Sequence, residues 1–185
     1  MGNEDGSKKG TEAPEAFAGG SQVEEEIARD NFVPLGVEVP ETLTAGYVRH
    51  NVASIVSPLI SVEDFLFEGE EAAEVWKDIS QVSVRGLQFA NHIKLRFADD
   101  LKSDFGEEEK TWITAFRLFL GRLILCLERI SKIVPSSDNA AEHYLAEKAK
   151  LVTWFREFES ELRLADIAEQ YRNQARDQLD REDED

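Results

Sequence analysis

The stretch from Thr111 to Val134, TWITAFRLFLGRLILCLERISKIV, constrains the fold of this chain more than any other segment. A helix advances by about 100° per residue, which gathers the polar side chains on an arc of about 140° and leaves roughly 220° to apolar ones. One neighbouring helix cannot cover so wide an apolar face, so the stretch predicts a central helix packed on two or more others. A membrane span needs about 18 or more uninterrupted apolar residues. This stretch is interrupted by Arg117, Arg122, Glu128 and Arg129.

Three further amphipathic helices are expected around it. Residues 41–60 carry apolar side chains at spacings of three and four, with an end or a kink near Pro58. Residues 70–102 favour a long helix with Gly86 as its weak point, although the alternation in residues 79–89, ISQVSVRGLQF, leaves a strand open. After a cap at Ser137 or Asp138, roughly forty residues without Gly or Pro predict a final helix of about 60 Å. The fold class predicted is therefore all-α, a four-helix-type bundle with a long C-terminal helix.

The chain divides into a disordered acidic tail (1–30), an extended arm (31–40), the helical bundle domain (41–180) and a short acidic tail (181–185). Residues 1–30 are rich in Gly, Glu and Ser and cannot bury enough apolar surface to offset the entropy of ordering. Residues 31–40, NFVPLGVEVP, contain two prolines, which disfavour helix, and enough apolar side chains to dock. The arm is expected to dock either on its own bundle or on a neighbouring subunit.

The net charge of −17 is concentrated in four segments. Residues 1–30, 63–78, 99–110 and 177–185 carry net charges of −5, −6, −4 and −5, so the remainder of the chain carries +3. Blocks of like charge are usually solvated faces or tails. The chain outside these four segments is therefore expected to be close to neutral.

Two features indicate an interaction surface. Leu118 and Leu125 lie seven residues apart inside the otherwise polar arc of the central helix, where a further contact would cover them. The last third of the C-terminal helix is rich in Ala, Arg and Gln, so it either projects from the bundle or packs on another chain. The candidate partner-interface residues are Leu118, Leu125, Phe158, Leu162, Ile167 and Tyr171.

No catalytic constellation is found. The single cysteine, Cys126, lies in the middle of an apolar arc and is expected to be an inert packed thiol. His50, His92 and His143 lie on three different predicted helices with no carboxylate or second histidine at ligand spacing. No catalytic residue, cofactor or metal ligand is assigned, and the chain is predicted not to be an enzyme. The absence of a signal peptide or an anchor predicts a soluble, intracellular, cytoplasmic protein without membrane contact.

A nucleic-acid role remains as an alternative. Four arginines on the two C-terminal helices are candidate phosphate contacts if they share one groove: Arg117, Arg122, Arg129 and Arg163. Pairing of these arginines with the many acids is the simpler interpretation. An acidic protein can also imitate DNA and inhibit a DNA-binding partner.

Residues 74–85, EVWKDISQVSVR, resemble a segment of the coat proteins of rod-shaped tobamoviruses, which are helical bundles that assemble around RNA. The resemblance covers 12 of the 185 residues. The Asp/Arg-rich cluster that follows in that family is not reproduced in LGRLILCLER. The resemblance implies a capsid-like, self-assembling subunit.

The function predicted from the sequence is that of a non-catalytic helical subunit for protein–protein interaction or assembly. It would act on a protein partner or by self-association. The alternative is a nucleic-acid-related protein, either coat-like or an acidic mimic.

Overall fold

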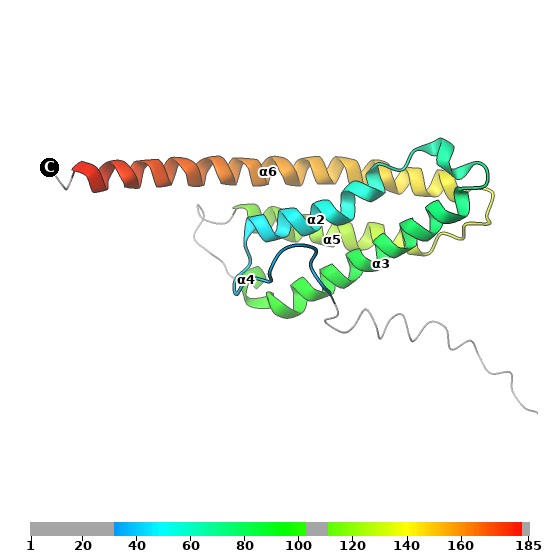
Figure 1. The fold of residues 1–185 in the computed structure, drawn as a ribbon, viewed down its shortest axis with the longest axis horizontal. Helices are drawn as coiled ribbons and strands as arrows, with labels where there is room; N and C mark the ends of the chain where they lie inside the picture. The colour runs from blue at the N-terminus through cyan, green and yellow to red at the C-terminus, as the bar shows by residue number, and fades with distance from the viewer. Residues whose placement is uncertain (1–31, 103–110, 183–185) are drawn as a thin grey trace, which may run out of the picture.

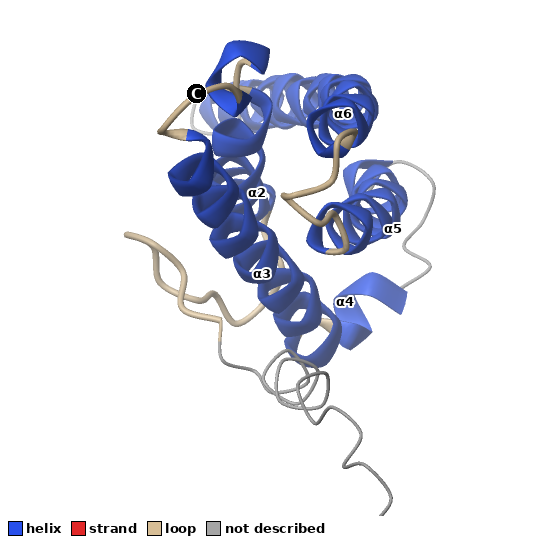
Figure 2. Ribbon diagram, turned by 90° about the vertical axis from the view of Figure 1, so that its right-hand side faces the viewer, coloured by secondary structure: helices blue, strands red, loops and turns tan. Residues whose placement is uncertain are grey.

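The protein is a bundle of four long helices in an up-down-up-down arrangement (Figures 1 and 2). The computed structural model describes residues 32–102 and 111–182. The long helices are α2 (Ala45–Ile60), α3 (Ala72–Arg96), α5 (Thr111–Ser131) and α6 (Ala140–Glu182). A 3₁₀ turn, η1 (Asp64–Phe67), and a short helix, α4 (Ala98–Lys102), connect them. Contacts run from α2 to α3, α3 to α5, α5 to α6 and α6 back to α2, which closes the bundle. The predicted all-α bundle is confirmed.

Residues 79–89 lie inside α3, and the described residues contain no strand, so the strand alternative is wrong. Gly86 does not interrupt this helix. It is buried, and a Cβ built on it would lie 2.9 Å from Cγ2 of Ile55 and in collision with Cδ1 of Leu127. Glycine is present here because α2, α3 and α5 approach one another closely at this point.

The helix ends differ from the predicted ones for local reasons. Helix α2 begins at Ala45 rather than at residue 41, because the Thr44 hydroxyl caps it by accepting from the Tyr47 N–H at 3.2 Å. It continues past Pro58, and the Ser61 N–H closes it by donating to the Ser57 carbonyl at 3.1 Å. The Ser-x-x-Asp pattern of residues 61–64 is also typical of a cap at the start of a helical turn. Ser61 ends α2 instead, and that turn is the 3₁₀ turn η1.

The core is continuous through all four long helices. Each helix contributes a stripe of fully buried side chains at three- and four-residue spacing. The largest of them are Val48, Ile55, Leu59, Phe89, Ile93, Phe97, Phe116, Leu123, Leu127, Tyr144, Leu151 and Leu162. The Tyr144 hydroxyl donates to the Leu59 carbonyl at 2.7 Å, which satisfies the one polar atom of that side chain.

The arm docks on its own bundle. Phe32 is buried against the ring of Phe89, with a centroid separation of 5.2 Å, and the Arg85 guanidinium lies 5.0 Å from the Phe32 ring centroid. The same guanidinium donates to the Val33 carbonyl at 3.1 Å. Docking on a neighbouring subunit is therefore not needed to cover this aromatic side chain. The expected disordered tail lies outside the described residues.

Helix α6 is about twice as long as its partner α5, with 43 residues against 21. At about 1.5 Å per residue, α6 measures roughly 65 Å. Its orange and red end runs well past the ends of α2 and α5 (Figure 1). Arg49 of α2 forms an ion pair with Asp166 of α6, at 2.6 Å.

Candidate interaction surface

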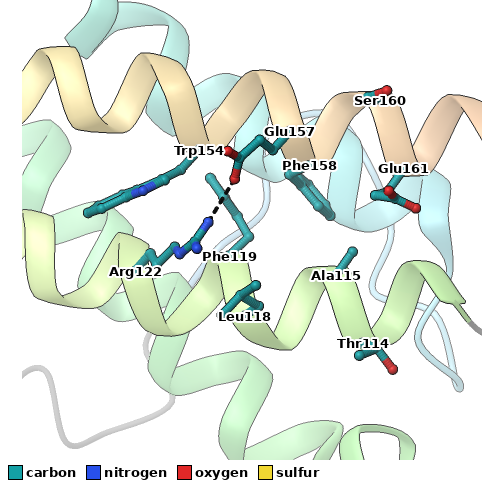
Figure 3. Close-up of a pocket in the computed structure, with 10 residues that line it drawn as sticks. All are labelled: Thr114, Ala115, Leu118, Phe119, Arg122, Trp154, Glu157, Phe158, Ser160 and Glu161. Carbon is teal, nitrogen blue, oxygen red and sulfur yellow. Dashed lines mark hydrogen bonds and ion pairs between the residues drawn. The ribbon is translucent and has the colours of Figure 1, made fainter.

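A groove of 560 Å³ runs between α5 and α6 on the outside of the bundle (Figure 3). We call it the α5–α6 groove. It is lined by Thr114, Ala115, Leu118, Phe119, Arg122, Trp154, Glu157, Phe158, Ser160 and Glu161.

Aromatic side chains form its base. The rings of Phe119 and Phe158 stack with centroids 4.7 Å apart and planes 8° from parallel. Such a pair contributes about 0.5–1.5 kcal/mol beyond its area burial. The α5–α6 contact beneath the groove is therefore firmly packed, and the groove is a surface depression rather than a gap in the core.

Ion pairs join α5 to α6, and one of them crosses the groove. Arg122 donates to Glu157 Oε2 at 2.8 Å, and its guanidinium lies 5.5 Å from the ring centroid of Trp154 (Figure 3). About two helical turns further along α5, Nη1 of Arg129 lies 3.5 Å from Glu147 Oε1. At least one side chain of each pair is more than half exposed, so each pair contributes on the order of 0–1 kcal/mol to the stability of the fold.

The leucine pair of α5 is exposed, as the sequence indicated. Leu118 is 57% exposed and Leu125 is 53% exposed. Both project from the side of α5 that also carries Arg122 and Arg129, because the four residues recur at spacings of four, three and four. Leu118 lines the groove and Leu125 continues its α5 wall.

The outer face of α6 carries a second apolar feature. Leu164, Ile167 and Tyr171 are 58%, 43% and 69% exposed. We call these three residues the outer stripe. Leu164 was not among the residues nominated from the sequence. The signal for it was available, since it lies seven residues before Tyr171 on the face opposite the buried Leu151, Phe155 and Leu162.

Two nominated interface residues are corrected. Phe158 is 2% exposed and Leu162 is 0% exposed, so both belong to the core of their own bundle. Their side chains lie on the inward face of α6, and Phe158 stacks on Phe119 of α5. Among the nominated residues, Leu118, Leu125, Ile167 and Tyr171 are accessible.

The four candidate phosphate contacts do not share one groove. Arg122 and Arg129 are paired with Glu157 and Glu147 across α5 and α6. Arg117 lines a different hollow, of 370 Å³, together with Lys94 and Lys102. Arg163 is exposed on α6. The arrangement favours intramolecular pairing over a continuous phosphate-binding track.

The groups with potential chemistry are dispersed. Burial, reinforced by the charge of Glu147, raises the pKa of the Cys126 thiol to about 12, so it remains protonated at neutral pH. Burial likewise raises the pKa of Tyr144. His92 is buried, with its Nε2 3.0 Å from the Tyr47 hydroxyl. Within the described residues, no group of three or more His, Cys, Asp or Glu side chains is placed to hold a metal ion.

None of the described helices combines the length and the apolar content needed to cross a bilayer. Comparison with protein-family models, with curated proteins and with solved structures gave no match for this chain.

Proposed function

We propose that this protein is a non-catalytic helical subunit that binds a protein partner through the outer side of α5 and α6. The observation that carries the proposal is the projecting end of α6, which leaves the bundle with Leu164, Ile167 and Tyr171 exposed on one face. A helix in isolation gains little stability from its intrinsic propensity, and most helical stability in proteins comes from packing an amphipathic face. A projecting helix with an apolar stripe therefore supports binding to another surface.

The α5–α6 groove extends this surface. Its aromatic base and the exposed Leu118 combine apolar contact area with a rim of charged side chains, which is the usual composition of a protein interface. Trp154 and Arg122 belong to residue types that are enriched among the strongest contributors to binding.

The nucleic-acid alternatives remain predictions without a supporting observation. Arg122 and Arg129 are engaged with glutamates, and neither lies beside Arg117. The cytoplasmic location also remains a prediction.

The proposal is tested by retrieving partners from a lysate of the protein's native cells. The bait is the full-length protein, and the Ile167→Asp variant is used in parallel as the control bait. Ile167 is 43% exposed, so the substitution should leave the fold intact. We expect the variant to lose the specific partner. The proposal would be contradicted if the protein stays monomeric and retrieves no partner that is lost in the Ile167→Asp variant. Absorbance at 260 nm of the purified protein tests the coat-like alternative in the same preparation.

A further inference from the structure

We propose that the partner is a second copy of this chain: the projecting end of α6 lies along the α5–α6 groove of that copy, antiparallel to its α6, and each copy makes the same contact with the other. This inference rests on the proposed function, because it uses the same surface. It names the occupant of that surface and the direction in which the occupant lies.

The groove and the outer stripe form one continuous face of α6. Glu157 and Ser160 line the groove, and the outer stripe follows them along the same helix. The successive spacings from residue 157 to residue 171 are three, four, three and four. This alternation keeps all five side chains on a single seam, as in a coiled coil. The seam from Trp154 to Tyr171 measures about 26 Å at about 1.5 Å per residue.

The seam is complementary to itself when two copies run antiparallel. In the register that places Ile167 of one copy against Leu164 of the other, Tyr171 of the first copy faces Ser160 of the second. Ser160 is a small side chain at the edge of the 560 Å³ groove, so it leaves room for a phenol ring. A two-fold axis between the helices repeats each of these contacts, which gives a closed dimer.

The charges along α6 favour the antiparallel direction. Residues 157–169 carry five acids and one arginine, whereas residues 170–176 carry two arginines and no acid. An antiparallel pair sets the basic segment of each copy against the acidic segment of the other. A parallel pair would set like charges side by side, which is unfavourable.

The overall charge of the seam also permits close approach. The chain has a net charge of −17, whereas the seam (residues 154–171) carries five acids and two arginines, a net charge of −3, and with the basic segment that follows it (to residue 176) the net charge is −1. Two copies can therefore meet along this stretch without bringing the strongly acidic segments together.

The same placement accounts for the exposed leucines of α5. Beyond residue 171, α6 of the second copy continues along the groove toward the α5 wall that carries Leu118 and Leu125. Both leucines are more than half exposed in the single chain. In this dimer the second copy would cover Leu118, which lines the groove, together with the outer stripe.

Sedimentation of the full-length chain over a concentration series tests the inference. We expect a monomer–dimer equilibrium, and Tyr171→Asp should raise the dimer dissociation constant at least about tenfold, since it replaces a buried phenol ring by a carboxylate beside Ser160, next to Glu157 and Glu161. The matched control is Leu95→Asp. Leu95 is 55% exposed on α3, away from the groove. The dimer dissociation constant of this variant should therefore equal that of the unmodified chain.

Disulfide trapping tests the direction, because the only native thiol, Cys126, is buried. An equimolar mixture of Ser160→Cys and Tyr171→Cys chains should form a mixed disulfide dimer under mild oxidation. Either variant alone should stay uncross-linked, since identical positions lie about 16 Å apart along the antiparallel pair. Efficient cross-linking of Tyr171→Cys with itself would overturn the antiparallel arrangement.

A chain that remains monomeric throughout the series would overturn the self-association while leaving the proposed function intact. The proposed function fails only when, in addition, the lysate experiment finds no partner that depends on Ile167.

Discussion

At the scale of single residues, two glycines in helices have opposite roles. Gly86 is buried where a Cβ would collide with Leu127 and lie 2.9 Å from Cγ2 of Ile55. Gly121 lies in the middle of α5, and a Cβ there would meet nothing within 4 Å. Both glycines weaken their helices by roughly 0.5–1 kcal/mol relative to alanine. Only Gly86 has a packing reason to be there.

We therefore predict that Gly86→Ala lowers the free energy of unfolding by about 1 kcal/mol, because overpacking costs about 1–3 kcal/mol and exceeds the gain in helix propensity. Leu127 and Ile55 are both fully buried and have little freedom to shift. Gly121→Ala is the control and should raise the same quantity by about 0.5–1 kcal/mol. Urea unfolding of the three proteins measures both changes. A stabilising Gly86→Ala would contradict the close approach of α2, α3 and α5.

At the scale of elements, α6 has one face that packs on the bundle and an opposite face with exposed apolar side chains. Leu151, Phe155 and Leu162 face the bundle, whereas Leu164 and Tyr171 face away from it. The sequence predicted the helix and its length correctly, because the stretch lacks Gly and Pro and its apolar residues recur at helical spacing. It did not separate Leu162 from Ile167. Both are large aliphatic residues, about 140° apart around the helix, and the sequence alone does not show which of the two faces the bundle covers.

The two aliphatic residues should respond differently to truncation. Leu162→Ala removes a fully buried side chain and should cost about 2–5 kcal/mol of unfolding free energy. Ile167→Ala, at a side chain that is 43% exposed, should change that free energy by no more than about 0.5 kcal/mol. Chemical denaturation at a protein concentration where the chain is monomeric measures both. Equal losses would show that the outer stripe packs within the single chain.

At the other elements too, local patterns predicted the helices but not the contacts between them. The four helices follow from periodicity, and the broad apolar face of residues 111–134 correctly placed α5 in contact with two neighbours, α3 and α6. The strand alternative for residues 79–89 arose because Val82 and Val84 alternate with polar residues. Packing decides in favour of helix, since Ile79, Ser83 and Gly86 are buried at helical spacings of four and three. Pairings such as Arg122 with Glu157 join residues 35 positions apart, and no local pattern predicts them.

At the scale of the whole molecule, the stability of the bundle and the association between chains depend on different parts of α6. The bundle is closed by contacts among α2, α3, α5 and the first part of α6. The end of α6 extends beyond those helices (Figure 1). Folding and association should therefore respond independently to changes in this end.

Removing residues 172–185 tests this separation. We predict that the thermal midpoint of the monomer changes by less than about 2–4 °C, the shift expected for 1 kcal/mol in a chain of this size. Self-association should fall sharply, because the basic segment that faces the groove is lost. Calorimetry and sedimentation of the truncated and full-length proteins measure the two properties. A large drop in the thermal midpoint would mean that the projecting end supports the bundle itself.

The position of Trp154 provides an optical signal for the groove. Its indole lines the α5–α6 groove beneath the Arg122 guanidinium, whereas Trp76 packs beside Tyr144 at the far end of the bundle. In a Trp76→Phe, Trp112→Phe background, emission would come from Trp154 alone. Whatever enters the groove would displace water from that ring and shift its emission to shorter wavelength. The chain thus carries its own fluorescent reporter of occupancy.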